Sequence, residues 1–455
     1  FASPVDISRR SLAQFVSTYH TKHHENSQSY REGGYMAIQK GNVLQQRFEV
    51  LGKLGWGEFS TVWLVHDRHF ASPELAFLAL KIAKCNPLVT ATTKYEARLL
   101  QYIRDSGVVT VSDRTDQHAP TSIANICDVF DLSGPYGQHL CFTMPVYGSN
   151  LLCVIDQVKD KRSRRAEVFL NMTKDIITGV LRALATLESL NVLHTDLKPE
   201  NVLCSLPDPN CVATVGEFLR GKESSVSAQF MRCFISHTAG EVDAVTAPVV
   251  TLADFCLALL LETEVSPNVK ALGGRRDAKI TVEMPGVLRN SHGILIQTRE
   301  YRAPEVLLGL DYNCRTDVWS LGCMAFELIT GQFLMDPKKK TRVEKEMDIE
   351  HIMMMMQLIG PVPARLFTPR ATPNRRMRHQ AKYFDEVGVF LYPERLQAYP
   401  RRQLATELET FMDQTEAHLA AQFILSCFTF DPFERHHAST LLNHAWLQRR
   451  GATSN

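Results

Sequence analysis

The sequence predicts an α+β fold in two lobes, a small β-sheet lobe followed by a larger, mainly α-helical lobe. Short apolar stretches with strand-like patterns lie before residue 146, and the longest helix-like pattern follows at 166–190. Between apolar flanks, the stretch 191–204 then packs a carboxylate, an ammonium group and an amide into one loop. Such a loop is costly for a purely structural turn, so we interpret it as the centre of a functional site.

Size and composition limit the number of domains and the classes of partner that this chain can have. The 455 residues allow either about three domain-sized units or one large two-lobed unit with insertions. Apolar residues make up 45% and charged residues 22% of the chain, which is enough to build a sizeable core. The formal net charge of +1 gives no bulk attraction to nucleic acid or to a membrane surface. No apolar run approaches the ~18 residues of a spanning helix. We therefore expect no direct nucleic-acid partner and no membrane association.

The cysteines and the termini carry weaker signals. Eleven cysteines are scattered without a Cys-x-x-Cys pair, which favours reduced thiols in an intracellular protein over disulfides or a zinc site. His20, His23 and His24 have ligand-like spacing but sit in a polar tail, so we favour a solvated tail over a metal site. We expect residues 1–29 to form a flexible extension without the apolar core of a signal peptide, and residues 448–455 to form a C-terminal tail.

The first lobe begins with a glycine-containing turn between two strands. Residues 47–54 alternate apolar and polar side chains, and residues 62–65 form a second apolar stretch. Gly55 and Gly57 between them would let the backbone close over a phosphate group, and Val62 could cover an adenine ring. A plain hairpin turn is the commoner cause of such spacing, so this signal is weak alone.

A buried lysine strengthens the interpretation. Residues 77–82 read as a buried strand that carries Lys81, and burying an ammonium group is expensive unless it is paired. Glu96, in the helix-like stretch 94–100, is the expected partner. The alternative is a lysine whose ammonium group reaches solvent at the strand edge.

The second lobe supplies the polar loop itself. Its residue types suit phosphoryl transfer: Asp196 could accept a proton from a hydroxyl, Lys198 could neutralise a moving phosphate, and Asn201 could offer oxygen to a hard cation. Further on, an apolar strand ends at Asp254, which places a second carboxylate where it could chelate magnesium. For any single residue, a polar surface turn with a capping Asp explains the pattern equally well.

Taken in order, these motifs resemble those of eukaryotic protein kinases. The stretch 194–201, His-Thr-Asp-Leu-Lys-Pro-Glu-Asn, resembles the catalytic loop, and residues 254–256, Asp-Phe-Cys, resemble the metal-binding Asp-Phe-Gly with Cys256 in place of glycine. The resemblance implies a two-lobed protein kinase fold with an antiparallel sheet, and ATP and Mg²⁺ as cofactors. It implies ATP-binding residues Leu54, Gly55, Gly57, Val62, Ala79, Lys81, Glu96, Met144, Val146 and Leu203, catalytic residues Asp196 and Lys198, and metal ligands Asn201 and Asp254.

The same resemblance implies structural pairs and domain limits. Glu305 closes an Ala-Pro-Glu motif and should pair with Arg435, and Asp317 should brace the catalytic loop. The kinase domain should span residues 30–447, with the lobes at 30–145 and 146–447. Composition shifts to polar, Pro- and Ser-rich stretches predict insertions at about 206–247 and 262–292.

Three features are very similar to the SR-protein kinases of the CMGC group. They are Gly33-Gly-Tyr35, the tryptophan at position 56 within the glycine-containing turn, and an insertion where that family carries its spacer. Thr195 also replaces the Arg that senses a phosphorylated activation segment in other kinases, so we expect activity without such phosphorylation. The resemblance implies a monomeric, divergent fungal-type member that phosphorylates serine in Arg/Ser-rich proteins, in cytoplasm and nucleus, in the regulation of mRNA splicing.

Two departures keep alternatives open. Glu350 and Asp348 match the acidic docking surface of that family, but Gln357 stands where the family has Glu, and four cations in residues 338–342 lie just upstream. These changes weaken attraction to a polybasic peptide. A Clk (LAMMER)-like dual-specificity kinase and a pseudokinase scaffold therefore remain the alternatives.

Overall fold

The computed structural model describes residues 27–70, 76–107, 122–157, 167–204, 249–261, 295–339, 341–367, 377–397 and 401–449. The predicted insertions and all but the last three residues of the predicted N-terminal extension lie outside these ranges, as do the three tail histidines. The cysteines within the described ranges are all free thiols, as expected. No helix of the described part is long and apolar enough to cross a membrane.

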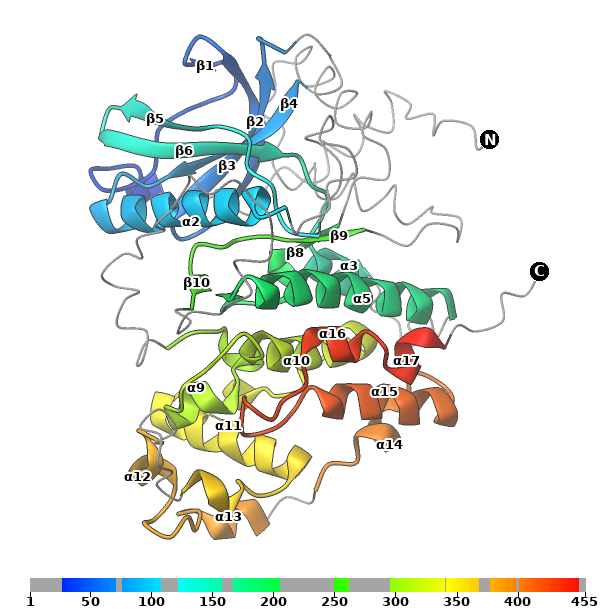
Figure 1. Cartoon of the computed structure of the whole chain (residues 1–455). Helices are drawn as coiled ribbons and strands as arrows, with labels where there is room; N and C mark the ends of the chain where they lie inside the picture. The colour runs from blue at the N-terminus through cyan, green and yellow to red at the C-terminus, as the bar shows by residue number, and fades with distance from the viewer. Residues whose placement is uncertain are drawn as a thin grey trace, which may run out of the picture.

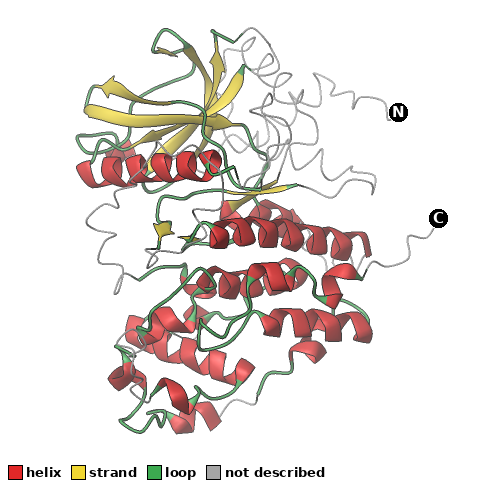
Figure 2. Cartoon of the chain, viewed as in Figure 1, coloured by secondary structure: helices red, strands yellow, loops and turns green. Residues whose placement is uncertain are grey.

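The small lobe is an antiparallel sheet with one long helix against it (Figures 1 and 2). The spatial strand order is β1-β2-β3-β4-β6-β5, and each strand pairs antiparallel with its neighbour. The strand bounds are β1 (Val43–Leu44), β2 (Phe48–Trp56), β3 (Ser60–Asp67), β4 (Phe77–Ala83), β5 (Val129–Gly134) and β6 (Gly137–Pro145). The strands predicted at 47–54, 62–65 and 77–82 therefore form as β2, β3 and β4.

Helix α2 (Pro87–Asp105) follows the fourth strand and carries the predicted glutamate. Its start is well specified: the side chain of Asn86 accepts hydrogen bonds from the amides of Leu88 and Val89, and Pro87 occupies the first turn. One face is buried and includes Tyr95 and Glu96. The helix therefore turns a carboxylate toward the sheet.

The large lobe is helical and is organised around two buried helices. Helix α5 (Glu167–Ser189) confirms the predicted amphipathic pattern, and every residue of α10 (Thr316–Thr330) is buried, so α10 forms the centre of this lobe. The other helices are α3 (Leu151–Gln157), α9 (Pro304–Leu308), α11 (Glu344–Ile359), α12 (Gln380–Tyr383), α13 (Pro393–Gln397), α14 (Leu404–Leu408), α15 (Gln414–Ser426), α16 (Ala438–Leu441) and α17 (Ala445–Gln448). Single 3₁₀ turns are η1 (Ser27–Ser29), η2 (Pro199–Asn201), η4 (Arg299–Tyr301), η5 (Pro337–Lys339) and η6 (Ala364–Leu366).

Two short antiparallel ladders frame the polar loop. Strand β7 (Val192–Leu193) pairs with β10 (Leu259–Leu260), and β8 (Val202–Cys204) pairs with β9 (Val250–Leu252). The catalytic-loop segment therefore leaves one ladder and enters the other. The ladders fix it beside the segment that carries Asp254.

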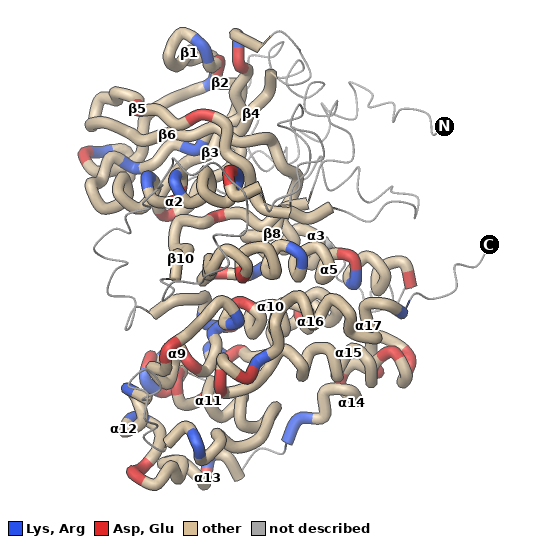
Figure 3. The backbone as a smooth tube through the Cα atoms, in the orientation of Figure 1, with Lys and Arg blue, Asp and Glu red and all other residues tan. Residues whose placement is uncertain are grey.

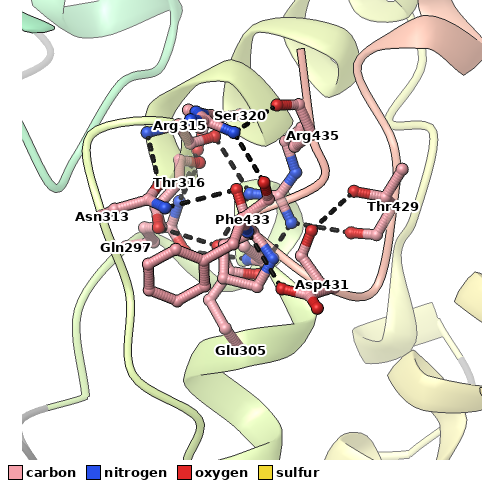
Figure 4. Close-up of polar contacts among 12 residues, drawn as sticks. Gln297, Glu305, Asn313, Arg315, Thr316, Ser320, Thr429, Asp431, Phe433 and Arg435 are labelled. Carbon is pink, nitrogen blue, oxygen red and sulfur yellow. Dashed lines mark hydrogen bonds and ion pairs between the residues drawn. The ribbon is translucent and has the colours of Figure 1, made fainter. Parts of the chain in front are cut away.

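A buried ion pair links two distant segments of the large lobe (Figure 4). The two guanidinium NH groups of Arg435 donate to the carboxylate oxygens of Glu305 at 2.7 and 2.8 Å, and neither side chain has any exposed surface. The hydroxyl of Thr316 adds a third hydrogen bond to Glu305, at 2.7 Å. The predicted pair is therefore confirmed, and it ties α9 to a segment 130 residues later.

Candidate active site

A cavity of about 420 Å³ lies between the two lobes. Leu54, Val62, Ala79, Met144 and Leu203 give it apolar walls, while charged and amide side chains gather at its other end. Of the predicted nucleotide-binding residues and metal ligands, all line this cavity except Val146, whose neighbours Pro145 and Tyr147 do. The cavity is also lined by Gly55, Trp56, Gly57, Ser60, Lys81, Glu96, Leu100, Ala124, Gly148, Asn150, Glu200, Asn201, Ala253 and Asp254.

The charged end begins with Lys81 of β4. Its Nζ donates to both carboxylate oxygens of Glu96, at 2.7 and 2.8 Å, which confirms the predicted pair. The same Nζ lies 3.5 Å from Oδ1 of Asp254. Burial pushes the pKa of Lys81 down, but the charges of Glu96 and Asp254 outweigh it and hold the pKa above its ordinary value. The ammonium group is therefore charged and points at the cavity end where phosphate groups would lie.

The catalytic-loop segment brings its polar groups together around Asp196. Lys198 Nζ lies 2.7 Å from Oδ2 of Asp196 and 3.1 Å from Oγ1 of Thr298. Thr298 donates to Oδ1 of Asp196 through its hydroxyl, at 2.7 Å, and through its amide, at 3.1 Å. Asn201 Nδ2 donates to the carbonyl of Asp196 at 2.8 Å, which leaves its own side-chain oxygen for the cavity. Four donors thus orient this carboxylate, because Asn201 Nδ2 also lies 3.3 Å from Oδ2, beside the Lys198 ammonium group and the hydroxyl and amide of Thr298.

Asp317 braces this loop, as predicted. Its carboxylate accepts the amide of His194 at 2.7 Å and that of Thr195 at 3.0 Å. Thr195 has a φ of 72°, which is strained for a β-branched residue, and its hydroxyl donates to the carbonyl of Leu257 at 2.9 Å. The loop is therefore tied both to α10 and to the segment that follows Asp254.

The carboxyl group of Asp254 has a lowered pKa, so it is ionised and can act as a cation ligand. Burial alone would raise its pKa, but the Lys81 charge and a hydrogen bond from the Cys256 thiol lower it below the ordinary value. The positive φ of this turn, 66°, falls on Asp254, and Cys256 is not among the residues with positive φ. Cysteine in place of glycine therefore costs no backbone strain in this conformation.

The donor set fits magnesium. A carboxylate oxygen of Asp254 and the amide oxygen of Asn201 are hard ligands, and Mg²⁺ ordinarily takes one or two protein groups together with phosphates and water. Within the described residues there is no cluster of three or more His, Cys, Asp and Glu side chains that would form an all-protein metal site. A cation here would therefore depend on the nucleotide for the rest of its ligands.

Several residues of the site were not found from the sequence. Thr298 contacts Asp196 across 102 positions, and Ala124 and Asn150 line the cavity without any motif to mark them. Glu200 and Tyr147 also line the cavity, and each is next in sequence to a predicted site residue. That adjacency was the one feature of the sequence that could have identified them. Sequence spacing cannot identify such contacts.

The acidic face of α11 differs from the expectation. Asp348 lies 2.6 Å from a guanidinium nitrogen of the buried Arg299, which also contacts Glu344, and Glu346 lies 2.6 Å from Arg395. Acidic and basic residues therefore alternate closely around α9 and α11 (Figure 3). Asp348 is not a free carboxylate, because it is already neutralised within the chain.

The basic run near α11 is also partly neutralised. Lys338 lies 2.7 Å from Oε1 of the buried Glu300, so one of its four cations is held against the segment before α9. Glu350 is half-buried on α11. The docking roles of Glu350 and Asp348 stay predictions.

Comparisons with known proteins agree with this geometry. The family model described as "Protein kinase domain" matches residues 48–218 and 247–447. The chain is 30% identical to "Serine/threonine-protein kinase SRPK" of Physarum polycephalum, covering 93% of this chain and 91% of that protein. It is 28% identical to "Protein kinase dsk1" of Schizosaccharomyces pombe, with 97% and 88% covered, and 26% identical to "SRSF protein kinase 3" of Mus musculus, with 93% and 90% covered. A crystal structure of a kinase domain, 22% identical, superposes with a TM-score of 0.56 over 91% of this chain and 98% of that one, which shows the shared fold.

Proposed function

The chain belongs to the protein kinase family, in its SR-protein kinase branch, and from this premise we propose that it transfers the γ-phosphoryl group of ATP to serines of Arg/Ser-rich proteins. It is a protein serine/threonine kinase. The observation that carries the proposal is the cavity itself, in which apolar walls suited to a purine end at Lys81, Asp254 and Asn201.

We assign roles from the contacts in the site. Lys81, held by Glu96, binds the phosphate oxygens, and the glycine-containing turn covers them. Asp254 and Asn201 would hold magnesium, which when bound would neutralise charge on the phosphates. The polar groups at this end of the cavity are held by hydrogen bonds within the chain, which favours pre-organised electrostatic stabilisation.

Asp196 is the residue we assign to the substrate hydroxyl. Its carboxylate is aimed by Thr298 and Lys198, so it can accept a hydrogen bond from a serine hydroxyl and take its proton. Lys198 stays protonated: burial lowers its pKa, but the Asp196 hydrogen bond and charge raise it above its ordinary value overall. Lys198 therefore screens the charge on the transferring group.

The charge of α11 bears on the choice of protein substrate, because Arg299 and Arg395 already neutralise carboxylates of this helix. Family membership supports Arg/Ser-rich substrates, while the paired α11 face would attract a polybasic peptide less strongly. A Clk (LAMMER)-like dual-specificity kinase is the alternative. We propose one kinase domain, residues 30–447, acting as a monomer in cytoplasm and nucleus on splicing factors, without binding nucleic acid directly.

The test is phosphate transfer from ATP–magnesium to two peptides, an Arg/Ser repeat and a serine peptide without arginines. We expect transfer to the repeat peptide, and Asp196→Ala should abolish it while ATP binding persists. Asp156→Ala, which changes an exposed carboxylate on α3, is the matched control and should behave as wild type. Transfer to the arginine-free peptide alone would refute the substrate assignment. Normal activity of Asp196→Ala would refute the role of that carboxylate.

A further inference from the structure

A short segment before the sheet contacts the glycine-containing turn that borders the nucleotide cavity. Residues 29–35, here called the N-terminal strap, form a closed turn in which the amide of Tyr35 donates to the carbonyl of Ser29 at 2.9 Å. The amide of Gly34 donates to the carbonyl of Arg31 at 2.8 Å. A Cβ at Gly34 would lie 2.0 Å from the Ser29 carbonyl oxygen, so the turn requires glycine. The sequence Gly33-Gly-Tyr35 therefore encodes a specific bend that presents Tyr35.

Tyr35 reaches the glycine-containing turn directly. Its side chain is 3% exposed, and its hydroxyl donates to the carbonyl oxygen of Gly57 at 2.6 Å. The amide of Gly57 donates to the carbonyl of Ser60 at 2.9 Å, which closes the turn between β2 and β3. Gly57 lines the nucleotide cavity, and both polar groups of its backbone are engaged by other groups of the protein.

The residues after β4 complete the attachment. The amide of Lys84 donates to the carbonyl of Phe59 at 2.9 Å, and its Nζ lies 4.5 Å from the centre of the Tyr35 ring. The amide of Cys85 donates to the carbonyl of Gly34 at 3.0 Å. Two carbonyls at the tip of the turn are thus hydrogen-bonded: that of Gly57 to the strap and that of Phe59 to Lys84. The segment that contains Lys84 also binds the strap, through the amide of Cys85.

We propose that Tyr35 is a positioning residue for the nucleotide, acting through Gly57. Its hydroxyl holds the turn in one conformation at the phosphate end of the cavity. The turn therefore loses less conformational entropy when ATP binds, which lowers the free-energy cost of binding. Because the bond joins Tyr35 to Gly57 and involves neither Asp196 nor Lys198, its loss weakens ATP binding more than it slows the chemical step. The inference rests on the proposed use of ATP.

The test compares two variants with one control. Tyr35→Phe keeps the ring and removes the hydroxyl, and we expect the Kd for ATP–magnesium in calorimetry to rise about fivefold, as for one hydrogen bond. KM for ATP should rise in parallel, with kcat at saturating ATP within about twofold. Gly34→Ala, which disrupts the strap turn, should shift Kd in the same direction. Tyr30→Phe is the control, because the Tyr30 hydroxyl accepts from Lys53 at 3.1 Å in the same region.

The outcomes separate the inference from the proposed function. An unchanged Kd in Tyr35→Phe overturns the role of Tyr35, and an equal rise in Tyr30→Phe shows general loosening and also overturns it. A fall in kcat without a rise in KM overturns it as well. Wild-type protein that binds ATP but transfers no phosphate refutes the proposed function, and the calorimetric Kd values then decide the role of Tyr35 by themselves.

Discussion

The buried pair of Glu305 and Arg435 allows a stability prediction worked from its contacts. Glu305 accepts two hydrogen bonds from Arg435 and one from Thr316. In Arg435→Met the carboxylate keeps only the threonine hydroxyl and stays buried, so we expect a loss of about 3–5 kcal/mol in the free energy of unfolding. A buried charge without its partner accounts for most of this loss.

Replacing the carboxylate of the pair should lower the free energy of unfolding less than replacing the guanidinium. Arg435 also donates to the carbonyls of Arg315, at 3.0 Å, and Thr429, at 2.8 Å, and its guanidinium carbon lies 5.2 Å from the centre of the Trp319 ring. In Glu305→Gln the guanidinium keeps these partners and the amide keeps the shape, so we expect a loss of about 1–3 kcal/mol. The double variant Glu305→Gln with Arg435→Met should lose less than the sum of the single variants.

Urea unfolding of the four proteins, followed by far-UV circular dichroism and by tryptophan fluorescence, measures these values. Calorimetric Kd values for ATP–magnesium in the same proteins should stay near wild type, since the pair does not line the nucleotide cavity. A loss below about 1 kcal/mol in Arg435→Met would refute the argument from the unpaired carboxylate. A larger loss in Glu305→Gln than in Arg435→Met would refute the asymmetry.

Three further changes test other parts of the molecule. Lys174, 2% exposed, lies 2.6 Å from Glu416, so Lys174→Met should lower the free energy of unfolding by about 3 kcal/mol without changing ATP affinity, and an unchanged urea midpoint would contradict this. Both ring nitrogens of the buried His351 lack a partner among the described residues, and burial, with the charges of Arg302 and Arg299, lowers its pKa to about 3. In the unfolded chain the imidazole binds a proton near pH 6.5, so the free energy of unfolding should decrease by up to about 1.4 kcal/mol per pH unit as the pH drops below 6.5. His351→Leu should flatten the pH profile of the unfolding midpoint. Cys256→Gly should lower stability by about 0.5–1 kcal/mol in thermal melts while ATP still binds, since Cys256 needs no positive φ; loss of ATP binding would show that its thiol is required at Asp254.

The sequence by itself determined the framework of this protein and the polar groups of its site. Alternating apolar residues marked the strand at 47–54, a short apolar run marked the buried strand at 77–82, and the 3.6-residue pattern at 166–190 marked α5. The pair of Lys81 with Glu96 was predictable because a buried charge demands a partner of opposite sign, and the pair of Glu305 with Arg435 was predictable from the resemblance to protein kinases. Periodicity and the cost of burying charge are both readable along a single chain.

Tertiary structure decided which distant groups meet. Thr298 aims Asp196 from 102 residues away, Arg299 neutralises the α11 carboxylate that the sequence offered for docking, and Tyr35 reaches the carbonyl of Gly57. None of these contacts follows from spacing, because each depends on the packed position of two elements that have no local pattern in common. A charge on a predicted helix face is the same in sequence whether it meets solvent, a substrate or an arginine of its own chain, and only packing distinguishes these cases.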